Sequence, residues 1–262
     1  MQLSLPTIQD LFVLIIAYLW IFGVLGFGEL LRRWRNYSTS VTRKIIHLFA
    51  GFTVFTVPFY SQAWLALLVS FPMLILIFLA SPKSPVKSLR AMFEVMAREE
   101  DYQTGHIWGP FLYAISINIL VALFALIPTL TPYFILPAIG LTAMYLGDGI
   151  APMIGGRFGK HHYTIGNATR SLEGSLAVFF SSFLGSWICW IFLDIFATGG
   201  ILVFDTPQVG ILSVVCAVSA SIIEGISPVG YDNITVPLLT TGILFIVASV
   251  IHPILLASIL FP

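Results

Sequence analysis

The chain has 262 residues, of which 58% are hydrophobic and only 9% are charged. A soluble globular domain carries about a quarter charged residues, so this composition excludes an ordinary soluble protein and indicates an integral membrane protein. Twelve Lys and Arg residues balance twelve Asp and Glu residues, and this zero net charge argues against nucleic acid as a partner. Cys189 and Cys216 lie in apolar runs without metal-ligand spacing, and we interpret them as core residues.

Apolar runs long enough for membrane helices follow one another along the chain. Because about 20 apolar residues cross the hydrocarbon core, the sequence predicts an all-α fold. We expect a polytopic membrane helix bundle of about eight transmembrane helices, in a single domain over residues 1–262. The expected spans are 8–28, 45–60, 63–80, 108–127, 133–153, 174–197, 208–226 and 236–260. The first run lacks a basic flank and a cleavage site, so we expect it to be retained as a span.

The basic residues are confined to three connections between these spans, namely the first, third and fifth. They are Arg32, Arg33, Arg35, Arg43 and Lys44, then Lys83, Lys87, Arg90 and Arg98, and finally Arg157, Lys160 and Arg170. With eight spans these connections share one side, and the positive-inside rule places that side in the cytosol and both termini outside. In the third connection, Arg90, Glu94 and Arg98 at four-residue spacing predict a surface helix.

Polar residues in membrane helices are costly unless they are paired or solvated, which makes them candidates for function. Here they form four clusters beside the basic connections. In the first, Arg43 and Lys44 precede His47 by four and three residues, so one helix face presents cationic groups suited to phosphate oxygens. Ordinary membrane anchoring by basic residues, with one satisfied histidine, explains the same pattern.

The second cluster places Asp148 between Gly147 and Gly149 at the end of an apolar run. The glycines allow a close approach of the backbone to a ligand, although small residues at 147, 151, 155 and 159 also suit close helix packing. Packing does not explain the carboxylate. Asp148 could hold Mg²⁺, which favours one or two carboxylates plus nucleotide phosphates, or it could accept a proton from an attacking hydroxyl.

The third cluster, Thr169-Arg170-Ser171-Leu172-Glu173, opens the sixth expected span. Ser171 or Thr169 could cap that helix, with Glu173 in its first turn. Alternatively, the helix N-terminus, Arg170 and Ser171 bind an anion and Glu173 binds a metal.

The fourth cluster joins the last two spans and contains Glu224, Asp232 and Asn233. These are either solvated groups of a Pro- and Gly-rich turn or ligands of a metal or nucleotide. His161 and His162 form a loop pair that we expect to be solvated. The chain has no P-loop, protein-kinase or dinucleotide-binding fingerprint, so any phosphoryl transfer must use a helical membrane site.

In their order along the chain, the four clusters resemble the polyprenol kinase family. This family includes dolichol kinases, phytol and farnesol kinases and a CTP-dependent diacylglycerol kinase. The similarity covers about residues 40–237 and rests on these strings: Arg43-Lys-Ile-Ile-His47 with Gly51, Gly147-Asp-Gly-Ile-Ala151 with Gly155 and Gly159, Arg170-Ser-Leu-Glu-Gly-Ser175, and Glu224 with Asp232-Asn-Ile-Thr-Val-Pro237.

The resemblance implies transfer of the terminal phosphate of a nucleoside triphosphate, typically CTP, to an isoprenoid or glyceride hydroxyl with a divalent cation such as Mg²⁺. On this basis we expect catalytic roles for Asp148, Glu173 and His47, with the two acids also as metal ligands. Nucleotide or phosphate contacts are expected from Arg43, Lys44, Gly147, Gly149, Lys160, Arg170, Ser171, Asp232 and Asn233. The nucleotide would arrive from the cytosol and the lipid alcohol from the bilayer.

Other functions compete with an isoprenoid alcohol kinase. A diacylglycerol kinase differs in its acceptor, and a phospholipid cytidylyltransferase would use the same nucleotide and metal but release pyrophosphate. A membrane transporter would place its site near the midplane between inverted repeats, whereas these clusters lie near one face and no repeat is evident.

Overall fold

The computed structural model describes residues 5–35, 38–196 and 203–260, and it confirms the all-α membrane fold. The elements are α1 (Ile8–Arg35), α2 (Thr39–Ala50), the 3₁₀ segments η1 (Gly51–Phe59) and η2 (Ala63–Ala66), α3 (Leu67–Leu79), α4 (Lys87–Met96), α5 (Glu99–Thr104), α6 (Trp108–Leu126), η3 (Thr131–Tyr133), α7 (Ile135–Thr142), the π-helical η4 (Ala143–Asp148), α8 (Gly149–Phe158), β1 (His162–Ile165), β2 (Ala168–Ser171), α9 (Leu172–Phe196), α10 (Thr206–Ile226), α11 (Asp232–Ile251) and α12 (Pro253–Leu260).

Six helical segments of the described chain are long and apolar enough to cross a membrane. They correspond to six of the expected spans: 8–34, 108–126, 131–158, 172–196, 206–226 and 232–251. The expected span 45–60 is divided between α2 and η1, and Pro58 lies inside the 3₁₀ part. The expected span 63–80 is a shorter apolar helix, Ala63–Leu79. The count of eight membrane crossings therefore stays a prediction.

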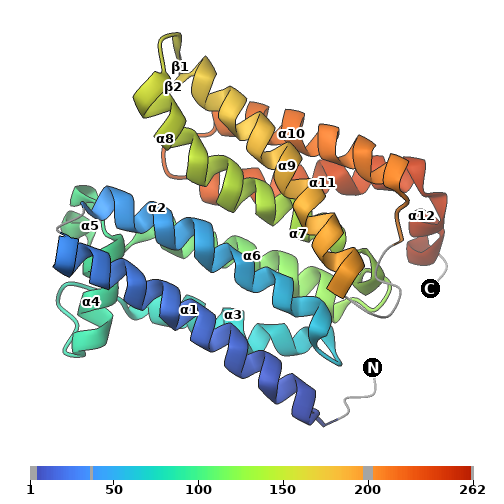
Figure 1. Cartoon of the computed structure of the whole chain (residues 1–262), viewed down its shortest axis with the longest axis horizontal. Coiled ribbons are helices and arrows are strands. Elements are labelled where there is room, and N and C mark those ends of the chain that lie inside the picture. The colour runs from blue at the N-terminus through green and yellow to red at the C-terminus, as the bar shows by residue number, and fades with distance from the viewer. Residues whose placement is uncertain (1–4, 36–37, 197–202, 261–262) are drawn as a thin grey trace.

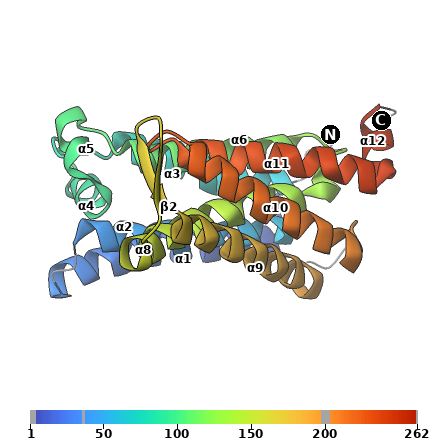
Figure 2. The same cartoon turned by 90° about the horizontal axis from the view of Figure 1, so that it is seen from above.

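The three basic connections lie at one end of the molecule, as predicted. Figure 1 shows α4, α5 and the β1–β2 hairpin at this end, whereas α1 begins and α12 lies at the opposite end. In the view from above, α6 and α11 run along one side, α8 and α9 along the other, and α10 lies between them (Figure 2). The assignment of the basic end to the cytosol stays a prediction.

The segment 131–158, which joins η3, α7, η4 and α8, is the central helix of the bundle. In its most apolar stretch, 83% of the residues are buried inside the molecule, against 28% in the corresponding stretch of α1. It packs against α9 on one side and α11 on the other. Asp148 is therefore carried by the most enclosed helix of the fold.

The β1–β2 hairpin was not predicted, because residues 162–171 were expected to form a connection and a helix cap. The strands pair antiparallel, with His162 opposite Ser171 and Tyr163 opposite Arg170. The turn contains Gly166, whose φ of 60° lies in the left-handed region that a two-residue hairpin turn requires. The Oη of Tyr163 lies 2.6 Å from Ser175 Oγ, which ties the hairpin to α9.

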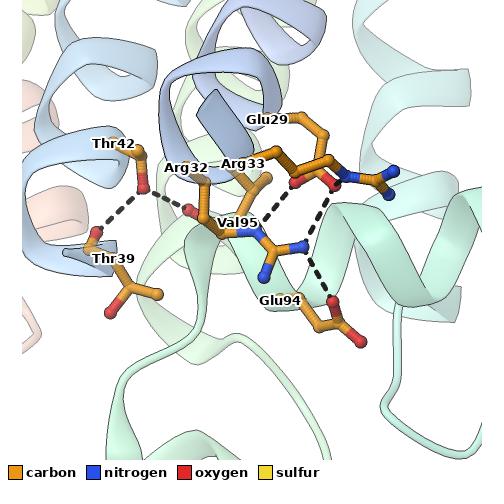
Figure 3. A network of polar contacts seen from close by, with 7 residues as sticks. All are labelled: Glu29, Arg32, Arg33, Thr39, Thr42, Glu94 and Val95. Atoms are coloured by element: carbon orange, nitrogen blue, oxygen red, sulfur yellow. Dashed lines mark hydrogen bonds and ion pairs between the residues drawn. The ribbon is translucent and has the colours of Figure 1, made fainter. Parts of the chain in front are cut away.

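Helix α4 was predicted from the spacing of Arg90, Glu94 and Arg98, and it is present, but these side chains do not pair with one another. Glu94 accepts a hydrogen bond from Arg32 of α1 at 2.9 Å, as Figure 3 shows. Arg90 donates to the carbonyl of Ser84, and Arg98 lies beyond the helix.

A second contact holds the end of α4 against α2. The hydroxyl of Thr42 donates to the carbonyl of Val95 at 3.0 Å (Figure 3). Together with the Arg32–Glu94 bond, it docks α4 on both α1 and α2 at the basic end of the bundle, beside the cavity described below.

Gly51 lies where α2 meets η1 and crosses the central helix. A Cβ at this position would overlap the ring of Tyr145 and lie 2.7 Å from the Oη of Tyr113. A Cβ at Gly23 of α1 would meet nothing within 4 Å. The two glycines form a matched pair for testing this crossing.

We expect Gly51→Ala to lower the free energy of unfolding by about 1–3 kcal/mol, because overpacking must displace an aromatic ring. Gly23→Ala should be neutral or stabilising by up to about 1 kcal/mol, since alanine favours the helix. Thermal unfolding of the purified protein in detergent measures both. Equal melting temperatures for the two variants would contradict the close crossing of α2 and η4.

Candidate active site

A cavity of about 720 Å³ lies at the basic end of the bundle, between α2, α6, α8, the hairpin and α11. One part of its wall is charged or polar and comes from segments far apart in the sequence: Arg43, Lys44, His47, Arg98, Glu99, Asp148, Arg170, Ser171, Glu224, Asp232 and Asn233. The other part is apolar: Ile21, Leu25, Met73, Ile77, Met92 and Met96. The cavity thus joins a polar site to a hydrocarbon surface.

Most of the residues predicted for the site line this cavity. They are Arg43, Lys44, His47, Asp148, Gly149, Arg170, Ser171, Asp232 and Asn233. Gly147, Lys160 and Glu173 do not line it. All four sequence clusters contribute at least one residue to the same space.

Asp148 is positioned by the π-helical turn η4, at whose end it lies. Such turns recur at functional sites because the extra residue disturbs the regular ladder of backbone hydrogen bonds. Here Nε2 of His47 hydrogen-bonds the carbonyl of Met144, in the same turn, at 3.1 Å. Asp148 Oδ2 lies 3.7 Å from this nitrogen, beyond hydrogen-bond distance. The carboxylate therefore keeps its lone pairs for a ligand.

Tyr113 of α6 fixes His47 from the other side. Its Oη donates to the backbone carbonyl of His47 at 3.0 Å, and the two ring centroids are 4.6 Å apart. A Cβ added at Gly149 would lie 3.4 Å from the His47 ring, in ordinary contact. The histidine is thus held between α6 and the central helix, with little freedom to turn.

Arg170 of β2 binds two carboxylates from the α10–α11 junction. Its Nε lies 2.7 Å from Glu224 Oε1, and its Nη2 lies 3.4 Å from Asp232 Oδ2. Both acids are buried. Within the described residues, Asp148 has no Lys or Arg within ion-pair distance, so it differs from the two acids that Arg170 neutralises.

Asn233 follows Asp232 in the first turn of α11 and lines the cavity. The residue is almost fully buried, and its side-chain oxygen has no hydrogen-bond partner in the described structure. A buried polar atom without a partner costs free energy. A bound ligand that donates a hydrogen bond would remove this cost.

Comparison with curated proteins identifies the family. A phytol kinase from Synechocystis sp. is 31% identical to this chain over 212 residues, which are 80% of this chain and 81% of that enzyme. This chain belongs to the polyprenol and phytol kinase family. Probable chloroplastic phytol kinases from Glycine max and Triticum aestivum are 28% and 29% identical, over 85% of this chain and 70% and 72% of theirs. No family model and no solved structure matches the chain.

The family resemblance of the sequence is therefore confirmed. The protein is a membrane kinase, a phosphotransferase whose acceptor is an alcohol. The remaining features of the cavity bear on how such a kinase holds its substrates.

Two cations at the start of α2 face the cavity of this kinase without a partner. Arg43 and Lys44 line it and form no hydrogen bond or ion pair with the described residues. Unpaired cations in a partly enclosed site are unfavourable unless an anion binds them. Phosphate oxygens are anions of the required kind.

Arg98 is a further cavity residue, and the sequence analysis did not assign it to the site. Its guanidinium lies close to Gly109 and Gly230. A Cβ added at Gly109 would lie 3.8 Å from Nη2, and one added at Gly230 would lie 3.9 Å from Nη1. The connection 81–107 folds back over the bundle to place it there. The only feature of the sequence that pointed to Arg98 as a site residue was its place in a basic connection, and every basic residue of the chain has such a place.

A divalent cation fits the charge balance of the cavity. Its lining contains four cations, Arg43, Lys44, Arg98 and Arg170, and four acids, Glu99, Asp148, Glu224 and Asp232. These charges cancel, so a bare triphosphate would meet no net positive field. No group of three His, Cys, Asp or Glu side chains in the described chain could hold a metal alone. Mg²⁺ needs only one or two carboxylates when substrate phosphates complete its shell.

The small residues of the central helix have a packing role, the alternative considered from the sequence. A Cβ on Gly147 would lie 2.7 Å from Ser182 Oγ, and one on Gly155 would lie 2.9 Å from Ser171 Oγ. Gly147 thus allows close contact of the central helix with α9, and Gly155 allows close contact with β2. Gly147, which was predicted to contact the nucleotide, therefore does not line the cavity.

Glu173 was predicted as a metal ligand beside Asp148, and the structure does not bring the two together. Its Oε1 lies 2.8 Å from Nδ1 of His161, and its Oε2 accepts from the backbone N–H of Lys160 at 3.1 Å. His161, expected to be only solvated, therefore has a partner. Ser171 Oγ accepts from the N–H of Gly174 at 3.2 Å, as expected for a cap of α9.

We expect Arg170→Met to lower the free energy of unfolding by about 3 kcal/mol, because two buried carboxylates lose their counter-ion. Thermal unfolding in detergent measures the effect. Arg157→Met is the matched control, since Arg157 is exposed and contacts the ring of Phe158. An Arg170→Met protein as stable as this control would show that Arg170 does not hold the site together.

Proposed function

We propose that this kinase transfers the terminal phosphate of CTP to an isoprenoid alcohol of the phytol type, with Mg²⁺, at the cytoplasmic face of the membrane. The proposal rests on one observation: the same cavity has both a charged wall and an apolar wall. The relatives named phytol kinase support the acceptor class. The positive-inside rule supports the cytoplasmic face.

The cations would bind the triphosphate at the charged wall. Arg43 and Lys44 have no hydrogen-bond or ion-pair partner among the described residues and suit the phosphate oxygens, and Arg98 lines the same cavity. Asn233 carries an unpaired oxygen suited to a donor such as the amino group of cytosine. These contacts position the nucleotide, which is the largest part of catalysis in phosphoryl transfer.

Asp148 and Asp232 are the acids best placed to hold Mg²⁺, and Glu224 is tied closely to Arg170. When bound, the ion neutralises charge that develops on the transferred phosphoryl group. We replace Glu173 by Asp232 in this role because Glu173 does not line the cavity.

The reaction itself is an in-line displacement. The alcohol oxygen attacks the terminal phosphorus, and a new P–O bond forms while the bond to the bridging oxygen breaks. CDP leaves, and the hydroxyl proton passes to a carboxylate. Asp148 either accepts this proton or holds the ion, because no Lys or Arg within the described residues lies at ion-pair distance from its carboxylate. His47 is held by Met144 and Tyr113 and would orient the acceptor or a phosphate.

The product labelled from CTP separates the candidate reactions. With purified protein, Mg²⁺, phytol and γ-labelled CTP, we expect the label in phytyl phosphate on thin-layer chromatography. Diacylglycerol tested in parallel should remain unlabelled. A CDP-lipid labelled only from α-labelled CTP would instead indicate a cytidylyltransferase. ATP, GTP and UTP as donors test the nucleotide preference.

We expect Asp148→Asn to reduce phosphorylation of phytol by a factor of about 10²–10⁴, since it removes either a base or a metal ligand. The variant keeps the size of the side chain, so its melting temperature should fall little. Asp194→Asn, at an exposed position of α9, is the control and should retain full activity. Full activity of Asp148→Asn would exclude this residue from the mechanism.

A further inference from the structure

A second, smaller cavity of about 100 Å³ adjoins the active-site cavity. We call it the tail pocket; its lining comes from η1, η2, α3 and α6, with single residues of α1 and α2. The two cavities share the lining residues Ile21, Ala50, Met73, Ile77 and Tyr113. Because Tyr113 also contacts His47, the mouth of the tail pocket lies beside the reacting groups.

The tail pocket offers no free polar group among its described lining residues. The hydroxyls of Thr53 and Thr56 donate to the carbonyls of Ala50 and Thr53, at 2.8 and 2.7 Å. Ser70 Oγ donates to Asn118 Oδ1 at 3.0 Å, and Asn118 Nδ2 donates to backbone carbonyls of both helices. The rest of the lining is apolar apart from the Tyr113 hydroxyl, which is bonded to His47. A site of this kind suits a hydrocarbon and not water.

The pocket runs along the bundle away from the active site and ends in the core. Its lining on α3 and η2 extends from Ile77 at the mouth to Ala66, which at the rise of a helix is about 16 Å. At the far end lie Val57, Ala66 and Val121, which are all buried in the main hydrophobic core. The end of the pocket opposite the active site is therefore formed by buried core residues.

Helix α1 covers the junction of the two cavities. Ile21 lines both of them, and two residues of α1 just before it bond to α3 and α2. Tyr18 Oη donates to the carbonyl of Leu68, and Trp20 Nε1 donates to that of Phe49, at 2.6 and 2.8 Å. The mouth of the pocket thus lies beneath a helix of whose apolar stretch only 28% is buried inside the molecule.

We propose that the apolar wall of the active-site cavity and the tail pocket together bind the hydrocarbon chain of the acceptor alcohol, and that the buried residues at the far end of the tail pocket limit the length of that chain. The hydroxyl then lies near Tyr113, beside His47 and Asp148, and the chain extends toward Ala66. This inference rests on the proposed alcohol kinase function. It identifies the acceptor as a single isoprenoid chain of limited length and not a two-chain glyceride or a long polyprenol.

Substitution at the far end of the tail pocket tests the proposal. Ala66→Leu fills the end of the pocket, and we expect it to lower kcat/KM for phytol relative to geraniol at least about tenfold, as a few methylene groups do in an apolar site. Farnesol, of intermediate length, should show an intermediate change. Ala63→Leu is the matched control: Ala63 lies in the same 3₁₀ turn, packs against the core and does not line the pocket. An unchanged phytol-to-geraniol ratio in Ala66→Leu would overturn the proposal.

A measurement on the unmodified protein covers the case in which Ala66→Leu does not fold. A phytol analogue with a photoreactive group at the tail end should label segments 54–57, 66–70 or 117–121, and excess phytol should compete. Labelling confined to the outer faces of α9 to α12 would overturn the proposal. If the protein phosphorylates no alcohol but shows the expected labelling, the proposed function fails while the tail pocket stands. If the protein phosphorylates phytol but this labelling is absent, the proposed function stands while the tail pocket fails.

Discussion

One guanidinium group holds the charged half of the site together. Arg170 binds Glu224 from the end of α10 and Asp232 from the start of α11, so three elements meet at a single residue. In a membrane protein, buried acids without a partner cost free energy. By neutralising these two, Arg170 leaves Asp148 as a cavity acid with no Lys or Arg within ion-pair distance among the described residues, which are the circumstances in which a carboxylate can bind a metal or a proton.

Much of this arrangement could be predicted from the sequence. Helix length and apolar periodicity determine the spans, and the positions of the basic residues determine which connections share an end. Once His47, Asp148, Arg170 and Asp232 were assigned to helix ends on the same side, their convergence followed from the topology.

The directions of side chains in the connections could not be predicted. Glu173 was expected to bind the metal because of the family resemblance, but the N–H groups of Lys160 and His161 before β1 bind its carboxylate outside the cavity. Arg98 enters the cavity because the connection around it folds back over the bundle. Both outcomes depend on contacts between distant segments, which local periodicity does not contain.

Because Arg170 lies on a strand and not on a helix, the site depends on the length of the turn that joins β1 to β2. Neighbouring residues of a strand point to opposite faces, and the turn at Gly166 sets which ones face inward. Inserting or deleting one residue in that turn shifts the pairing by one step and moves each side chain of β2 to the opposite face, so that Arg170 turns away from the cavity. The two acids would then lose their cation without any mutation inside the cavity. Variation in the length of this short loop is therefore far more restricted than its exposed position suggests.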